Sequence, residues 1–92
     1  MLKIVFTGQF KKDYKTALKR GCDPEELKTV ISLLAMQQPL PEKYRDHALE
    51  SSRNYQGMRE CHVKPDWLLI YRIFADKLTL ELIRTGSHSD LF

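Results

Sequence analysis

The sequence has few of the features that mark secreted, disulfide-stapled or membrane proteins. It contains only two cysteines, Cys22 and Cys61, which lie far apart, and no apolar run that follows a basic start or approaches membrane-spanning length. Internal repeats and low-complexity segments are also missing. These absences favour a reduced, cytoplasmic protein over a stapled extracellular domain or a membrane-embedded one.

A strong excess of one charge is missing as well. Fifteen Lys and Arg against twelve Asp and Glu leave a net charge of +3, with a pI near 9.0. This mild basic balance leans towards an anionic partner without requiring one. The 92 residues are enough for a single domain with one core, residues 1–92, but not for a second cofactor-binding lobe.

Apolar runs predict four strands. Residues 2–7 alternate with a period of two, and a second alternating run covers residues 78–85. Residues 57–74 are interpreted as a hairpin, in which residues 67–74 form a central strand of aromatic and aliphatic side chains. Pro65 fixes φ and lacks a donor for a strand ladder, so the chain is expected to reverse there.

Two stretches with helical periodicity follow the first strand. They cover residues 9–20 and residues 24 to about 37. Asp23 is predicted to cap the second helix, with Pro24 at its first position and Glu26 reaching back to the cap. The element order β-α-α-β-β-β indicates an α+β fold, with a two-helix hairpin packed on one face of a mostly antiparallel four-stranded sheet and the other face open.

The connection over residues 37–56 is long and lacks sustained periodicity, which is typical of a binding or catalytic loop. It contains His47, which in isolation is interpreted as a solvent-exposed loop residue. Arg45, Arg53 and Tyr55 add cations and an aromatic ring, a mixture that grips a phosphate backbone and stacks on an unpaired base.

His62 and Asp66 flank the turn of the central hairpin. An imidazole near a carboxylate is a usual arrangement for a proton-transfer group near neutral pH. On these two residues alone, however, a solvated turn is the simpler interpretation. Three histidines in the chain also suggest a metal, but none are spaced i, i+4 on a predicted helix, so no metal site is expected.

The placement of Arg84 is open at this stage. Simple alternation puts it on the same face as Leu80 and Leu82, so reaching a polar cleft requires a bulge, a strong twist or a position beyond the core edge. Cys61 alternates with neighbours on its strand and is predicted to pack as a small apolar residue rather than to act as a nucleophile.

Four spaced motifs together match a known pattern. They are Tyr44-Arg45-Asp46-His47, Arg59-Glu60-Cys61-His62-Val63-Lys64-Pro65-Asp66-Trp67, Arg84-Thr85-Gly86-Ser87-His88 and Leu91-Phe92. With these motifs essentially the whole chain resembles the YafQ branch of the RelE-like toxins, which are ribosome-dependent endoribonucleases of bacterial type II toxin-antitoxin systems. The resemblance implies a RelE-like fold with Trp67 beside active-site positions at His47, His62, Asp66, Arg84, His88 and Phe92.

The expected chemistry suits these residue types. Cleaving RNA through its own 2′-hydroxyl requires a base for that proton, an acid for the departing 5′-oxygen, and a cation near phosphorus. We predict that His88 is the acid and that Arg84 clamps the phosphate. His62 and His47 are predicted to share the base role, with Asp66 orienting or joining them. The predicted RNA-binding residues are Arg45, Arg59, Lys64, Trp67 and Phe92, and either Phe92 or Trp67 could stack on a base.

The resemblance also implies two partners, a cognate antitoxin protein that neutralises the toxin and messenger RNA held in the ribosome. No membrane, metal or small-molecule cofactor is expected. One alternative hypothesis is a non-catalytic basic RNA- or ribosome-binding module with incidental histidines, and another is a growth-neutral scaffold. Convergence of His47, His62 and His88 in one cleft would argue against the binding module.

Overall fold

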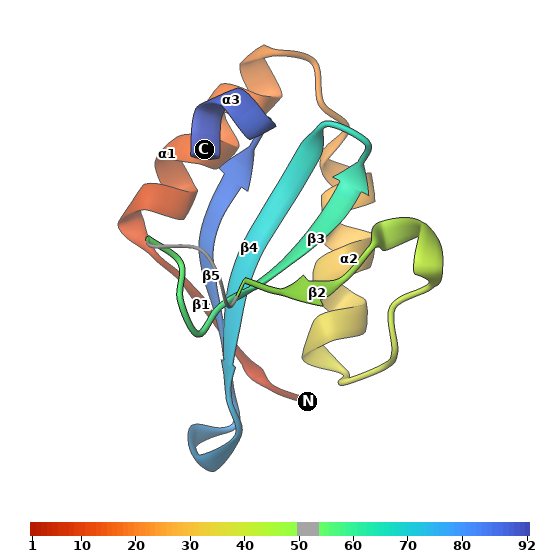
Figure 1. Cartoon of the computed structure of the whole chain (residues 1–92), viewed down its shortest axis with the longest axis vertical. Coiled ribbons are helices and arrows are strands. Elements are labelled where there is room, and N and C mark those ends of the chain that lie inside the picture. The colour runs from red at the N-terminus through yellow and green to blue at the C-terminus, as the bar shows by residue number, and fades with distance from the viewer. Residues whose placement is uncertain (50–53) are drawn as a thin grey trace.

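The computed structural model describes residues 1–49 and 54–92, and within them five strands form one sheet in the order β1-β5-β4-β3-β2 (Figure 1). The strands are β1 (Lys3–Phe6), β2 (His47–Ala48), β3 (Arg59–Lys64), β4 (Trp67–Phe74) and β5 (Thr79–Gly86). β1 runs parallel to β5, and the other neighbouring pairs are antiparallel. The predicted α+β fold with a mostly antiparallel sheet and a central β4 is confirmed.

The prediction of four strands is wrong by one, because β2 lies within the stretch expected to be an irregular loop. His47 pairs opposite Glu60 and Ala48 opposite Arg59, so β2 forms an edge of the sheet. A 3-10 turn, η1 (Glu42–Tyr44), precedes it. Two residues are too short to show a period of two, so the sequence pattern carries no signal for this strand.

Helices α1 (Gly8–Lys19) and α2 (Pro24–Ala35) form the predicted hairpin on one face of the sheet. The Asp23 carboxylate caps α2 as expected by accepting from the Glu25 amide at 2.9 Å. Glu26 does not return to the cap, since its carboxylate lies 2.9 Å from the Lys64 ammonium. The buried side chains between helices and sheet include Phe10, Ala17, Leu27, Val30, Leu34, Leu69, Tyr71, Leu80 and Leu82.

The opposite face of the sheet is not open as predicted, because a second, smaller core covers part of it. Tyr55, Leu68, Ile70 and Leu91 are buried together there. Leu91 belongs to a short helix that the sequence pattern did not predict, α3 (His88–Leu91), which follows β5 and lies beside α1 (Figure 1). No helix in the described ranges is long and apolar enough to cross a bilayer.

A β-bulge in β5 resolves the placement of Arg84. Arg84 pairs with Ile70 and Leu82 pairs with Tyr71, so Ile83 is an extra residue opposite β4. The bulge breaks the alternation and aligns Arg84 with the face of Ile70 instead of the helix-covered face. Of the three routes that remained open for Arg84, the structure therefore uses the bulge.

Candidate active site

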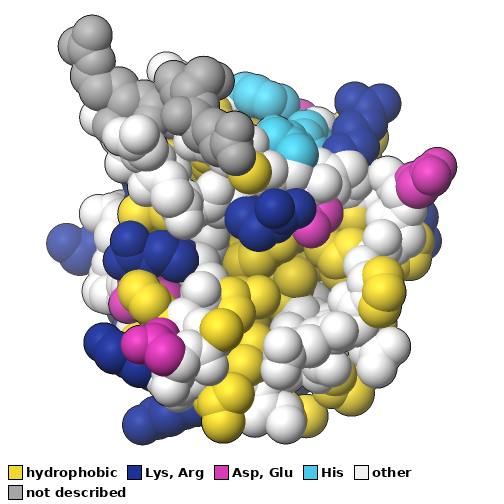
Figure 2. Space-filling view, turned by 60° about the horizontal axis from the view of Figure 1, so that its bottom comes forward, with side chains coloured by type: hydrophobic (Ala, Val, Ile, Leu, Met, Phe, Trp, Pro, Cys, Tyr) yellow, Lys and Arg dark blue, Asp and Glu magenta, His cyan; other side chains and the backbone are white. Residues whose placement is uncertain are grey.

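Three histidines from different elements lie side by side at one edge of the sheet. The ring centroids of His47 on β2 and His62 on β3 are 6.2 Å apart, and those of His62 and His88 on α3 are 5.8 Å apart. Figure 2 shows the histidine side chains gathered in one surface patch. Phe92 extends the series, with its ring 6.2 Å from that of His88. We call these four residues the histidine row.

A buried carboxylate joins two members of the row. Glu60 is only 4% exposed, and its Oε1 atom lies 3.4 Å from Nε2 of His47 and 3.4 Å from Nε2 of His62. Glu60 and His62 are two residues apart on β3, so their side chains share a face of the sheet. Sequence reasoning gave Glu60 no role, although an acidic residue at i−2 from a strand histidine was a usable signal.

Backbone carbonyls hold the other nitrogens of the same two rings. Nδ1 of His47 lies 2.7 Å from the Arg45 carbonyl oxygen, and Nδ1 of His62 lies 3.3 Å from that of Pro65. A carbonyl oxygen only accepts, so each Nδ1 must donate. When either ring is doubly protonated, it donates from Nδ1 to the carbonyl oxygen and from Nε2 to Glu60. When the ring is neutral, Nδ1 keeps its proton and Nε2 is free to accept one. This arrangement suits groups that take up a proton.

Asp66, which lies outside the histidine row, orients His88. Oδ1 of Asp66 accepts from the His88 amide at 3.1 Å and lies 3.3 Å from Nδ1 of its ring. These hydrogen bonds from His88 lower the pKa of Asp66, which keeps the carboxyl ionised at neutral pH. The prediction that Asp66 serves His62 is therefore wrong, since its observed partner is His88, 22 positions away.

A cap fixes the helix that carries His88. Ser87 caps α3, and Asp90 completes a reciprocal capping box by accepting from the Ser87 amide at 2.9 Å. The Asp90 carboxylate also pairs with Arg20, the residue that directly follows α1, at 2.5 Å, and this pairing lowers the pKa of Asp90. Gly86 has φ of +155°, and a Cβ there would meet Asp90 Oδ2 at 2.9 Å, so the approach requires glycine.

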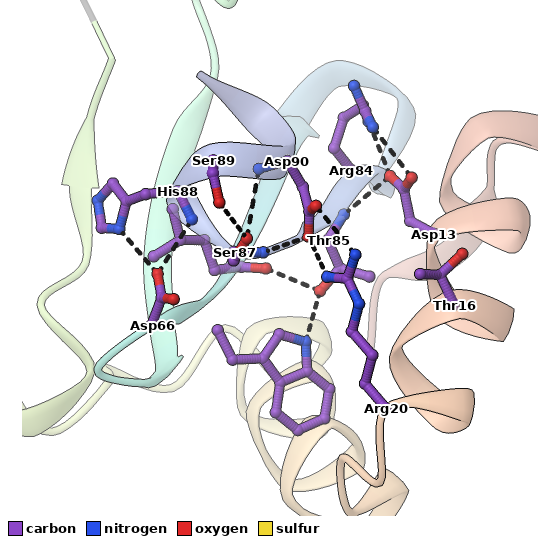
Figure 3. Close-up of polar contacts among 12 residues, drawn as sticks. Asp13, Thr16, Arg20, Asp66, Arg84, Thr85, Ser87, His88, Ser89 and Asp90 are labelled. Carbon is purple, nitrogen blue, oxygen red and sulfur yellow. Dashed lines mark hydrogen bonds and ion pairs between the residues drawn. The ribbon is translucent and has the colours of Figure 1, made fainter.

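Arg84 lies apart from the histidine contacts (Figure 3). Its Nε and Nη2 atoms bind the two carboxylate oxygens of Asp13 on α1 at 2.7 and 3.0 Å, and the Thr85 amide donates to the same carboxylate at 3.2 Å. The hydrogen bonds with Asp13 raise the pKa of Arg84. In Figure 3, Asp66 and His88 face each other on one side of α3, whereas Arg84 and Asp13 lie on the other.

Two aromatic residues that were expected to stack on RNA bases are buried. Trp67 is 5% exposed and donates from Nε1 to the Thr85 hydroxyl at 2.9 Å. Tyr55 is 8% exposed and donates to the Leu91 carbonyl oxygen at 3.1 Å. Their stacking roles are therefore wrong, because both rings are used in packing. Phe92, at 60% exposed, remains available, and it contacts the Tyr55 ring edge-on at 5.4 Å.

The basic residues that were predicted to contact RNA differ in whether a carboxylate already pairs with them. Arg59 pairs with Asp46 at 2.9 Å, and the Tyr71 hydroxyl donates to the same carboxylate, which anchors the segment before β2. Lys64 pairs with Glu26, as described above. Arg45 is exposed, in the left-handed conformation with φ of 47°, where the chain turns into β2. Arg53 lies outside the described residues.

The buried cysteine of β3 is not placed for catalysis. Cys61 is buried, and desolvation raises the pKa of its thiol to about 12, so the thiol stays neutral and packs as predicted. Among the described residues, no group of three or more His, Cys, Asp or Glu side chains is arranged to hold a metal ion.

Comparison with known proteins places the chain among bacterial toxins. Residues 2–92 match the family described as "Bacterial toxin of type II toxin-antitoxin system, YafQ". The chain is 49% identical to the mRNA interferase toxin YafQ of Escherichia coli BL21-DE3 over 90 residues, which cover 97% of this chain and 94% of that protein.

Solved structures agree with this match over the whole chain. A metal-bound toxin from Helicobacter pylori superposes with a TM-score of 0.92 at 47% identity, covering 100% of both chains. YafQ in the E. coli DinJ-YafQ complex superposes with a TM-score of 0.86 at 46% identity, covering 100% of this chain and 99% of that one. The expected RelE-like fold is thereby confirmed, and the chain belongs to the YafQ family of bacterial type II toxin-antitoxin toxins.

Proposed function

We propose that this toxin is an endoribonuclease that cleaves messenger RNA in the ribosome and so inhibits translation. The observation that carries the proposal is the histidine row, in which three imidazoles from three elements lie within 6.2 Å of their neighbours. Close relatives named mRNA interferase toxins support the same activity. A binding module has no need for adjacent imidazoles that are each oriented by a separate acceptor.

In the proposed reaction, His47 or His62 accepts the proton of the RNA 2′-hydroxyl. The 2′-oxygen then bonds to phosphorus, the bond from phosphorus to the 5′-oxygen breaks, and His88 gives its proton to that leaving oxygen. The products are a cyclic phosphate and a 5′-hydroxyl end. Acid and base on opposite sides of the phosphate fit the order of the row, with His62 between His47 and His88.

The supporting residues have two proposed roles: some position the histidines, and Arg84 supplies positive charge near the phosphate. Glu60 is proposed to position the two base candidates, and Asp66 to position His88. Arg84 is proposed to supply positive charge near the phosphate, with Asp13 fixing the plane of its guanidinium. Asp13 offsets part of the positive charge of Arg84. Arg84 therefore acts on the phosphate through the fixed orientation of its guanidinium as well as through its charge.

The proposal includes two partners. A cognate antitoxin protein is expected to bind the toxin and silence it, as the DinJ-YafQ complexes are toxin-antitoxin complexes. The ribosome is expected to orient the message, because a 92-residue domain offers little surface for positioning a flexible strand. The reaction is proposed to proceed in the cytoplasm without a metal, since acid, base and cation all come from the chain.

The test compares a ribosome-bound message with the same RNA free in solution. Wild-type protein should cut the bound message, leave 5′-hydroxyl ends, and fail on a message with a 2′-deoxy nucleotide at the cut. Activity should persist when a chelator removes free metal ions under conditions that keep ribosomes intact. This control is needed because a similar toxin from Helicobacter pylori is metal-bound. Cleavage of the deoxy message would refute the mechanism, and binding to ribosomes without any cleavage would favour the non-catalytic module.

A further inference from the structure

A basic hollow lies next to the histidine row. It has a volume of about 390 Å³ and opens between α2, η1 and the β3–β4 turn. The side chains that matter for its chemistry are Glu26, Thr29, Lys43, Arg45, His62 and Lys64. These residues come from three separate segments, so the hollow is a product of the fold and not of one basic stretch of sequence.

The charge of the hollow favours an anion. Lys43, Arg45 and Lys64 line it, and among the described residues Glu26 is the single carboxylate on its wall. Glu26 and Lys64 lie 2.9 Å apart and offset each other, which leaves Lys43 and Arg45 as the excess charge. The Lys43 ammonium lies 5.1 Å from the centroid of the Tyr44 ring, so its partner within the described part of the chain is an aromatic face.

The hollow connects to the base side of the row. His62 forms part of its wall, and Arg45, another wall residue, holds Nδ1 of His47 through its carbonyl oxygen. His88 and Phe92 lie beyond His62, at the acid end of the row. A strand that follows the row from Phe92 to His62 reaches the hollow next, and the assignment of acid and base determines whether that end of the strand lies upstream or downstream of the cut.

We propose that the hollow binds the backbone phosphate on the 5′ side of the nucleotide whose 2′-hydroxyl attacks. The base takes the 2′-hydroxyl proton of that nucleotide, and the acid protonates the 5′-oxygen of the next one. The base end of the row therefore faces the 5′ part of the strand. This polarity rests on the proposed function. Lys43 and Arg45 hold the upstream phosphate, and Glu26 weakens its binding by repulsion and by occupying Lys64.

The test uses short single-stranded RNAs with a 2′-deoxy sugar at the attacking position, so that they bind without being cut. Two versions differ only in whether the attacking nucleotide carries a 5′-phosphate. The wild-type protein should bind the 5′-phosphorylated version about tenfold more tightly at low salt, as expected for charge-assisted hydrogen bonds. A third version carries the extra phosphate at its 3′ end and should gain less.

Matched variants locate the effect. Lys43→Ala/Arg45→Ala should abolish the preference and reduce the slope of log affinity against log salt by about 0.7 for each phosphate that the protein no longer neutralises. Lys11→Ala/Lys15→Ala removes the same charge from the exposed face of α1 and should keep the preference. Glu26→Gln should increase the preference, which keeps the test decisive even if the double variant in the hollow folds poorly.

Two results would overturn the inference. One is an equal loss of preference in the α1 control, which would indicate general electrostatic attraction. The other is an equal or larger gain from the 3′-phosphate, which would reverse the polarity. The experiment measures binding and not cleavage, so it can separate the phosphate site from the proposed function. If cleavage proved independent of His88 but the 5′-phosphate preference persisted, the proposed function would be refuted and the phosphate site would stand.

Discussion

Two clusters of charged side chains flank α3 and differ in how tightly their members are paired. On one side, Asp13 binds Arg84 and Arg20 binds Asp90, with contacts from 2.5 to 3.2 Å. We call these two pairs the α1 brace. On the other side, the ion-pair contacts of the histidine row to Glu60 and Asp66 are longer, at 3.3 to 3.4 Å.

The difference separates groups that stay charged from groups that exchange protons. Carboxylate and guanidinium stay ionised across the neutral range, and their pairing moves the pKa values of Asp90 and Arg84 further from neutrality. Imidazole is the side chain suited to proton exchange near neutral pH. The brace thus fixes α3 from one side so that His88 can be presented on the other, and substitutions in the two clusters should fail in different ways.

The largest effect is expected from His88→Ala. Loss of a general acid typically costs about 10²- to 10⁴-fold in rate, and His88 is exposed, so the fold should remain intact. Initial rates on ribosome-bound RNA and the thermal melting temperature measure the two effects. Ser89→Ala, the next residue on the same helix, is the matched control and should keep its rate. An unchanged rate in His88→Ala would remove the row from the mechanism.

Glu60→Gln should reduce the rate by up to about 10²-fold while leaving stability nearly unchanged. The substitution keeps the shape but removes the charge shared by the two base candidates, and small misplacements of catalytic groups have costs of this size. A double-mutant cycle with His62→Ala should be strongly non-additive. Glu81→Gln, which disturbs the ion pair between Glu81 on β5 and Arg72 on β4, is the control. Additive losses would mean that Glu60 does not act through His62.

Asp13→Ala should lower the free energy of unfolding and, because Arg84 loses the carboxylate that positions it, should also lower the cleavage rate. It leaves the Arg84 guanidinium and the Thr85 amide without their acceptor, which costs about 1–3 kcal/mol at this largely buried carboxylate. Urea denaturation measures the change. Asp76→Asn, in the exposed turn after β4, should be near neutral, so equal losses in the two variants would show that the brace adds nothing specific.

The smallest effect is expected from Asp90→Asn, about 1 kcal/mol at neutral pH from the weakened helix cap. The pKa of Asp90 is lowered in the folded state, so its contribution is present at neutral pH and is lost progressively as pH falls from about 4 towards the lowered pKa. The stability difference between wild type and variant should therefore shrink at acidic pH. Urea titrations at pH 7 and pH 3 test this, and a constant difference would argue against the ion pair.

Local patterns were enough to predict the frame of the fold. The run of residues 67–74 matches β4, and Asp23 with Pro24 marks the start of α2 as the structure has it. In these cases the signal lies within a few consecutive residues. The second core and α3 were missed because they depend on segments that meet only after folding, such as Tyr55 and Leu91.

The sequence was enough to name the histidines of the site, but it was less successful in predicting which residues contact them. The three histidines were named, but Asp66 was given to His62 because they are close in sequence, whereas its contact is with His88. Glu60 was missed because half of its role depends on His47 across a two-residue strand. Trp67 was a candidate for stacking because the resemblance puts it beside the active-site positions, and which way its ring packs depends on Thr85, 18 positions away.

The packing of Trp67 also gives the protein an internal optical reporter. It is the single tryptophan of the chain, it is buried, and its indole nitrogen donates to Thr85, whose own amide donates to Asp13 of the α1 brace. Its fluorescence therefore senses the junction between α1 and β5 without any added label. Loosening of that junction, by mutation or by a bound partner, would register there as a change in emission before the whole chain unfolds.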